Sequence, residues 1–476
     1  MNQIQKTIED FVHQARRPCL CEPGEPPIAL SAANFTIALT GAGLRLEAWD
    51  EKHNLSRRII GLASRPERGR LTLTVEKFGK KTGALALIDL ASAAQHRAGV
   101  RHHRQEFQQR FARFLRRQFP AYSLDQLSTS PDLHASLSPF FPRALLHSGA
   151  TAWAAIAAPA DPLRTDGVLS FGLIWLDYLR QRQPGLRIAG LILYLPAELS
   201  QTTCLRVAFL DRRRAQYRAF LYDPDGDERE TDPADHGNLD THLQPWSRPG
   251  FEPDPPWMQG LPDVESVPLR GGGRSFQVHG LEFGRSLVTN PLSEASNRLI
   301  QRAEQLSNIR VAGGKHHELA YRRNPEAWLE SQVRKNLEML HPNLLQNPVY
   351  GQVPAFTAAD RGMIDLLASD RDGRLTVIEL KASEDLHLPL QALDYWLRVK
   401  WHLDRREFTQ NGYFPGIAVR STPPKLMLVS PALEIHPTNE RVLSYFSPEV
   451  EVEQVGVSVE WRKQVKVVFR TATTCH

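Results

Sequence analysis

The sequence has few cysteines, no long apolar run and no phosphate loop of the kind found in ATP-driven motors. The four cysteines among its 476 residues are scattered, at Cys19, Cys21, Cys204 and Cys475. Such usage indicates no disulfide framework and predicts a reducing, cytoplasmic location. There is no run of about 18 apolar residues and no apolar signal segment in residues 1–17, so we expect no membrane partner. A G-x-x-x-x-G-K-[ST] motif is also absent, which argues against a built-in helicase.

Length and composition indicate several globular domains. Hydrophobic residues make up 41% of the chain and charged residues 23%, and the net charge of +5 is compatible with a polyanionic partner. We expect an α/β and α+β multidomain protein, divided as follows: a β-rich N-terminal domain at 1–95, a helical and mixed α/β middle domain at 96–222, a linker rich in Pro, Gly and Asp at 223–273, and an α/β domain at 274–476.

Hydrophobic periodicity places the main elements of the first half and of the segment that follows the linker. A helix is expected near the N-terminus, followed by antiparallel hairpins, and the middle domain is expected to hold a helix followed by strands. The predicted ranges are: helices at 1–16, 101–119, 167–182 and 293–307; strands at 35–39, 44–49, 71–76, 84–88, 188–195, 205–210, 216–222 and 275–283.

The helix at 101–119 is strongly basic. A stripe of phenylalanines is predicted to face the core, and arginines surround it, among them Arg110, Arg113 and Arg117. Arginine clusters bind phosphate well, so these three are candidate nucleic-acid contacts. A solvated helix face is an equally good interpretation, and a membrane-surface helix is a weaker third.

The most informative stretch is the apolar strand that ends in Ile378-Glu379-Leu380-Lys381. Side chains of a strand alternate between its two faces, so Glu379 and Lys381 point the same way. Opposite charges are costly to bury and add little to stability there. The pair therefore suggests a functional site, although a simple ion pair is the alternative.

A second acid is expected beside this pair. The run 362–368 predicts a strand that contains Asp365, and the Asp372-Gly373 step between the two strands is a hairpin signal. A turn there places Asp365 opposite residues 378–380, close to Glu379. Two carboxylates and a lysine would then converge, which suits a hard cation such as Mg²⁺.

This arrangement resembles the core of the PD-(D/E)XK nuclease superfamily, although Ile364 stands where the nominal motif has proline. The resemblance covers about the last third of the chain, and the first 250 residues resemble no family that we can name. In the superfamily a helix bearing an acid precedes the strands. Here Asn324 is a suitable N-cap and Pro325 a suitable first helical residue, and the helix acid is either Glu326 or Glu330.

A further helix is expected to begin at Pro389 and to run to about residue 403. On it Gln391 and Tyr395 lie four residues apart and hence on one face, which Arg398 continues. The RecB-like branch of the superfamily carries a glutamine and a tyrosine at this spacing near the DNA. The resemblance therefore implies that Gln391, Tyr395 and Arg398 position nucleic acid.

The resemblance implies metal-dependent phosphodiester hydrolysis, with DNA as the expected substrate, in repair or in defence against foreign DNA. Asp365, Glu379 and the backbone carbonyl of Leu380 would hold Mg²⁺ or Mn²⁺, with Glu330 nearby, and Lys381 would act on the attacking water or on the developing charge. The alternatives are a silent nucleic-acid-binding or scaffold protein with the same fold, and a nuclease gated by an N-terminal sensor. A protein partner or a homodimer is also possible.

The middle domain raises the question of a second copy of this fold, because its helix followed by strands has a similar shape. The strand at 191–195 carries no charge, and the segment has no acid paired with Glu-x-Lys. If the fold is repeated, we expect this copy to be inactive.

Overall fold

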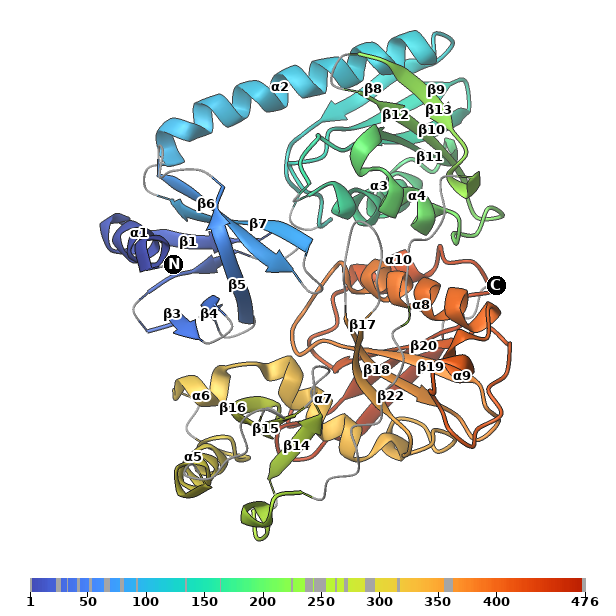
Figure 1. The fold of residues 1–476 in the computed structure, drawn as a ribbon. Coiled ribbons are helices and arrows are strands. Elements are labelled where there is room, and N and C mark those ends of the chain that lie inside the picture. Colours follow the sequence, from blue (N-terminus) through green and yellow to red (C-terminus); the bar gives the residue numbers. More distant parts are fainter. Residues whose placement is uncertain are drawn as a thin grey trace.

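A computed structural model shows a mixed α/β chain built around four separate β-sheets (Figure 1). This confirms the expected mixed, multidomain class at the level of secondary structure. The structure describes residues 2–472 with the following segments left out: 23–26, 32, 41–42, 51–53, 64–68, 78–80, 91–92, 133–134, 163, 224–225, 236–242, 244–253, 262, 269–272, 287–295, 315–316 and 355–362. Within the described residues no helix is long and apolar enough to cross a membrane.

The N-terminal region is an antiparallel seven-stranded sheet covered by one helix, α1 (Asn2–Gln14). Leucines that alternate along its strands form one buried face, and Ile8 and Phe11 of α1 pack on that face. The region is therefore β-rich, as the alternating pattern predicts. Its strands are β1 (Pro18–Cys21), β2 (Ile28–Ala29), β3 (Phe35–Thr40), β4 (Gly43–Trp49), β5 (Asn54–Leu62), β6 (Arg70–Lys77) and β7 (Lys81–Asp89), in the spatial order β2-β1-β7-β6-β5-β4-β3.

The middle region is a six-stranded mixed sheet with helices on both faces. The long helix α2 (Ala93–Gln118) runs from the N-terminal sheet across the outer face of this sheet (Figure 1). The other elements are β8 (Ser123–Ser128), β9 (Arg143–Ser148), β10 (Thr151–Ala157), α3 (Val168–Arg182), β11 (Arg187–Pro196), α4 (Gln201–Val207), β12 (Gln216–Tyr222) and β13 (Glu228–Thr231). Strands β10, β11 and β12 are parallel, and the outer pairs are antiparallel.

Two expectations for this region need correction. The predicted strand at 205–210 is wrong, because residues 201–207 form helix α4, whose buried side includes Thr203, Cys204 and Val207. The proposed linker also begins later than residue 223, since β13 pairs with β12 and completes the sheet. Much of the remaining linker, at 236–242, 244–253, 262 and 269–272, lies outside the described residues.

A small three-stranded sheet follows, with strands β14 (Val264–Pro268), β15 (Arg274–Val278) and β16 (Leu281–Ser286), and with helices α5 (Ser296–Ile309) and α6 (Leu319–Arg322) beside it. β14 lies within the segment predicted as linker. The single strand expected at 275–283 is instead a hairpin, because His279 and Gly280 both have positive φ and reverse the chain.

The C-terminal region is a second six-stranded mixed sheet between helix layers. Its elements are α7 (Pro325–Lys335), β17 (Tyr350–Pro354), β18 (Met363–Ser369), β19 (Leu375–Leu380), α8 (Leu388–Asp404), α9 (Glu407–Gln410), β20 (Lys425–Pro431), α10 (Thr438–Leu443), β21 (Val452–Val457) and β22 (Val467–Ala472). The spatial order follows the chain order. β19, β20 and β21 are parallel, and the other pairs are antiparallel. Helix α7 packs on one face of the sheet, and α8 and α10 lie on the other.

Short 3-10 turns join several of these elements, at Thr165–Gly167, Ala197–Leu199, Pro233–Asp235, Pro256–Met258 and Leu337–Met339. The main apolar core runs without a break from the α3 side of the middle sheet to the α8 side of the C-terminal sheet. These two helix layers face each other between the two sheets (Figure 1). The two six-stranded units are thus packed as a pair.

Candidate functional site

The hairpin of β18 and β19 brings the two acidic strands into the predicted register. Asp370 accepts hydrogen bonds from the backbone N–H groups of Asp372 and Arg374, and Gly373 has φ +84° at the turn. Leu366 pairs with Ile378, so the next step of the ladder places Asp365 opposite Glu379. The backbone N–H of Leu380 donates to Oδ2 of Asp365 at 2.9 Å. The turn chemistry therefore brings the two carboxyl groups together.

The carboxyl group of Glu379 is buried, and that of Asp365 is half-buried beside it. Glu379 is 2% exposed, and burial together with neighbouring Asp365 raises its pKa well above the ordinary value. Burial, and after it the negative charge of Glu330, raises the pKa of Asp365 to about 7. The Oε2 atom of Glu379 is buried and has no hydrogen-bond partner. Like charges this close disfavour double ionisation unless a cation compensates them.

Lys381 supplies part of that compensation. Its Nζ lies 3.8 Å from Oε1 of Glu326 and 3.9 Å from Oδ2 of Asp385, and its charge lowers the pKa of both Asp365 and Glu379. The side chain of Lys381 is 14% exposed. Its single positive charge therefore lies, largely shielded from water, among several carboxyl groups. Sequence reasoning missed Asp385, which lies in the loop after the strand, where no periodic pattern marks it.

Both candidate acids of helix α7 lie near this cluster. Glu330 is buried and acts on the pKa of Asp365, whereas Glu326 is 45% exposed, pairs with Lys381 and acts on the pKa of Glu379. The structure thus brings both acids to the site, with Glu330 on its buried side. Asn324 precedes the helix, but in a left-handed conformation and without a side-chain capping hydrogen bond.

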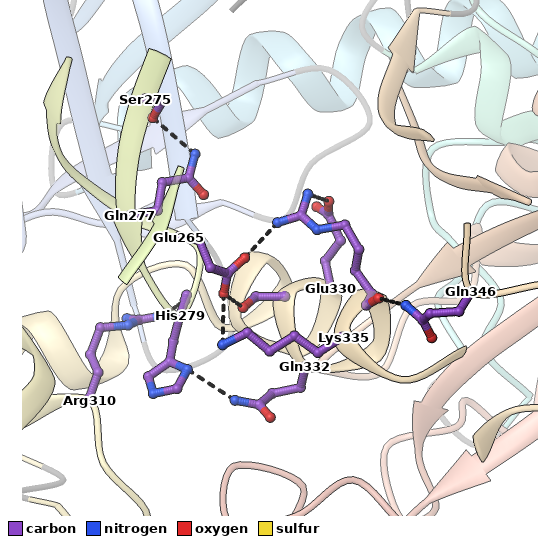
Figure 2. A network of polar contacts seen from close by, with 11 residues as sticks. Glu265, Ser275, Gln277, His279, Arg310, Glu330, Gln332, Lys335 and Gln346 are labelled. Carbon is purple, nitrogen blue, oxygen red and sulfur yellow. Dashed lines mark hydrogen bonds and ion pairs between the residues drawn. The ribbon is translucent and has the colours of Figure 1, made fainter. Parts of the chain in front are cut away.

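A polar network holds the Glu330 side of the site (Figure 2). Arg334 reaches Oε1 of Glu330 at 3.4 Å with one nitrogen and Oε2 of Glu265 at 2.8 Å with the other. Glu265 lies on β14 and is also bound by Ser331 and Lys335. These groups, together with Arg334, lower its pKa against the opposing effect of burial. The small three-stranded sheet is thereby fastened to the helix that carries the acid.

Strand β17 leaves room for this network. An added Cβ at Gly351 would meet Nη1 of Arg334 at 3.0 Å and Oε1 of Glu330 at 3.1 Å. A side chain at this position would therefore push into the contact between the two groups. The sequence analysis did not identify Gly351, Glu265 or Arg334, because only tertiary packing brings these residues to their partners.

Helix α8 places two of its predicted residues against the carboxylates. Nε2 of Gln391 donates to the hydroxyl of Tyr395 at 3.1 Å. Burial, and then the charge of Glu379, raises the pKa of Tyr395 well above its ordinary value. Arg398 differs, because it is only 3% exposed and its guanidinium carbon lies 5.8 Å from the centre of the Tyr395 ring. Its burial leaves little surface for contact with a bound polymer.

The arginines of α2 lie in another part of the molecule. Arg110 donates to the hydroxyl of Tyr194 at 3.2 Å and to the backbone oxygen of Asp223 at 2.6 Å, and Arg117 pairs with Glu228. These contacts occupy both side chains within the middle domain. Arg113 is exposed. The helix therefore presents less free positive charge than its sequence indicates.

The donor set fits a hard divalent cation. Asp365 and Glu379 offer carboxylate oxygens, one of them buried and unpartnered, with Glu330 close by. No group of three or more His, Cys, Asp or Glu side chains forms a ready metal cluster in the part of the chain that the structure describes. Mg²⁺ is commonly held by one or two carboxylates and retains several waters, so two converging acids suffice for such a site.

Comparison with known protein families finds no family model that matches the chain, and comparison with curated proteins finds no matching relative.

Proposed function

We propose that the C-terminal domain is a metal-dependent nuclease of the PD-(D/E)XK type, with a restriction-endonuclease-like core, and that it hydrolyses phosphodiester bonds of DNA. The observation that carries this proposal is the convergence of Asp365, Glu379 and Lys381 at one end of the β18–β19 hairpin. The unpartnered Oε2 of Glu379 supports it, because a buried carboxylate oxygen without a donor is costly unless a ligand binds it.

Each residue has a separate role in this proposal. Asp365 and Glu379 would hold Mg²⁺ or Mn²⁺ together with the carbonyl of Leu380, and Glu330 would stand beside them. When bound, the ion lowers the pKa of water and neutralises phosphate charge. Lys381 orients the attacking water or stabilises charge on the phosphate. The water oxygen bonds to phosphorus, and the bond from phosphorus to the leaving sugar oxygen breaks. The attacking water gives up one proton to the solvent, and the leaving oxygen takes one from it.

Two residues of α8 are assigned to substrate positioning. The amide of Gln391 and the hydroxyl of Tyr395 already contact each other beside the carboxylates. Gln391 is half-buried and its amide can donate to a phosphate oxygen, whereas Tyr395 is only 4% exposed and acts by positioning that amide. The resemblance to the RecB-like branch supports this assignment. The scaffold or silent-binding alternative predicts the same fold without turnover, so a cleavage assay separates the two.

The test uses the full chain with Mg²⁺ or Mn²⁺ on single-stranded DNA, double-stranded DNA and RNA. We expect cleavage of DNA, and we expect Asp365→Asn, Glu379→Gln and Lys381→Ala each to lower the rate by roughly a hundredfold or more. Asp372→Asn is the matched control, since Asp372 is an exposed acid on the same hairpin. Equal cleavage by wild type and by the Asp365 and Lys381 variants would show that the site is misassigned. No cleavage by wild type under any condition would favour the silent alternative.

A further inference from the structure

The two six-stranded units share one topology. In each, a helix precedes three antiparallel strands, a helix then leads to a parallel strand, a second helix leads to another parallel strand, and an antiparallel strand closes the sheet. Helices α2, α3 and α4 of the middle unit thus correspond to α7, α8 and α10 of the C-terminal unit. The expectation of a repeated fold had placed the equivalent of the Glu-x-Lys strand at 191–195, whereas the topology places it in β10.

Hydrogen bonds fix the correspondence residue by residue. Directly after β19, the N–H of Lys381 donates to the carbonyl of Val429 at 3.0 Å. Directly after β10, the N–H of Ala158 donates to the carbonyl of Tyr194 at 2.9 Å. Ala158 therefore stands where Lys381 stands in the other unit, and Ile156 stands in the place of Glu379.

The position of the first acid follows from the neighbouring strand. Ile156 pairs with Arg143 across the β9–β10 ladder, so Arg143 occupies the place of Asp365. It is 5% exposed, and its guanidinium donates to the backbone oxygens of Ser130 and Ser138. Ile156 and Ala158 are almost fully buried. A guanidinium, an isoleucine and an alanine offer no ligand to a cation.

The two units are also related in space by an approximate twofold axis. The N–H of Asp211 donates to the carbonyl of Tyr445, and the N–H of Ser447 donates to the carbonyl of Phe209, both at 2.8 Å. Between these bonds lies the bridge of Leu210 with Phe446. Leu210 lies three residues after the end of α4, and Phe446 lies three residues after the end of the corresponding helix α10. Equivalent positions therefore bond to each other reciprocally, as they do in an isologous contact.

The helix layers follow the same symmetry. Helix α10 packs on α3, and the corresponding helix α4 packs on α8. At the second of these contacts, Arg206 of α4 forms a buried ion pair with Asp394 of α8. The surface through which a second copy of the C-terminal unit could pack in this way is thus already filled from within the chain.

We propose that the chain is an internal pseudo-dimer with a single hydrolytic site, and that it cuts one strand of a duplex in each encounter. This inference rests on the proposed function. The two strands of a duplex are related by twofold axes, and a symmetric pair of sites matches them, as half-sites match symmetric dimers. In this chain the middle unit has no counterpart of the two carboxylates and the lysine, so only the C-terminal unit can hydrolyse a bond. Hydrolysis of the second strand therefore requires release and renewed binding in the opposite polarity.

The first experiment follows supercoiled plasmid over time with limiting full-length protein and Mn²⁺. We expect nicked circles to accumulate first and linear molecules to appear only after a lag, as independent nicks meet. Linear product from the outset, without a nicked precursor, would overturn the inference, and so would cleavage confined to single-stranded DNA or RNA. Ile156→Val is the matched control, because it trims the position equivalent to Glu379 and should leave the time course unchanged.

The second experiment needs no catalysis. Binding of Mn²⁺ to the full chain is measured from the loss of the free-ion signal in electron paramagnetic resonance. We expect both Asp365→Asn and Glu379→Gln to abolish tight binding, with circular dichroism confirming that each variant is folded. Tight binding that survives in both folded variants would reveal a second cation site and overturn the single-site claim. If wild type binds Mn²⁺ at this site but cuts no substrate, the proposed nuclease function fails and the one-strand inference fails with it.

Discussion

Leu380 donates its backbone N–H to the Asp365 carboxylate over 2.9 Å, which joins the central acid of one strand to the last residue of the next. The bond holds a half-buried carboxyl group beside Glu379 and near Glu330. An arrangement that concentrates like charge costs stability in the absence of a counter-ion. Sites that bind ligands commonly carry such a cost.

The first prediction is that Asp365→Asn stabilises the metal-free protein. Asparagine keeps an acceptor for the N–H of Leu380 but removes the negative charge beside Glu379 and Glu330. Because the folded-state pKa of Asp365 is raised to about 7, the wild-type free energy of unfolding should fall as the pH rises from about 4 through 7, and the variant should lose part of this dependence. Thermal unfolding in the presence of a chelator tests this. In excess Mn²⁺ only the wild type should gain stability. A variant that melts below wild type at pH 8 without metal would contradict the argument.

Local signals explain how much of the site could be predicted from the sequence. The Asp-Gly turn set the register of Asp365 against Glu379, strand alternation put Lys381 on the same face, and both predictions depend on residues close together in the chain. Tertiary contacts left no such signal. Glu265 and Arg334 bind each other although they lie 69 residues apart in the sequence. Neither segment has a local pattern that predicts this contact.

The fold, too, could be predicted where the signal is local and not where it depends on tertiary contacts. Periodicity predicted the strands of the hairpins, because each has a regular apolar face, whereas Pro325 and Pro389 marked the starts of helices α7 and α8. Periodicity mistook α4 for a strand, since a seven-residue helix buried on one side shows too few turns to reveal its period. The duplication was suspected from its shape, but its register became apparent only from the hydrogen bonds of Ala158 and Lys381.

The second prediction concerns the contact between the small sheet and helix α7. Arg334→Met should leave Glu265 with fewer cationic partners in a mostly buried place, and we expect a loss of about 1–3 kcal/mol in the free energy of unfolding. Urea unfolding measures this loss, and hydrogen exchange should show weaker protection in β14. Arg371→Met is the control, because its pair with Glu338 is exposed and should contribute about 0–1 kcal/mol. Equal losses in the two variants would argue against the network.

The third prediction addresses the buried ion pair between the two units. Arg206→Met leaves Asp394 buried without its bidentate partner, so we expect a loss of about 3–5 kcal/mol. Replacing both residues, as Arg206→Met with Asp394→Leu, should recover much of it, because no unpaired charge remains. A double-mutant cycle in urea measures the coupling. A double variant no more stable than Arg206→Met alone would show that other contacts of Arg206, such as that to the carbonyl of Asp166, dominate.

The fourth prediction is that Cys21 is the reactive thiol among the described cysteines. Its sulfur lies 3.9 Å from that of Cys19, and the hydrogen bond between them, assisted by the charges of Arg164 and Arg70, lowers the pKa of Cys21 to about 7. Burial raises the pKa of Cys204 to about 12, which makes that thiol inert. Iodoacetamide should modify Cys21 half-maximally near pH 7, as peptide mass spectrometry can follow.

The matched variant for this prediction is Cys19→Ala, which removes the donor but keeps strand β1. Without the hydrogen bond the pKa of Cys21 should move toward that of an ordinary thiol, about 8.5. Alkylation at pH 7 should then slow by about five- to tenfold, because the thiolate fraction falls. Cys204→Ala should leave the rate unchanged. If the pH midpoint of Cys21 modification is the same with and without Cys19, the hydrogen bond does not set its reactivity, and the nearby arginines alone must account for it.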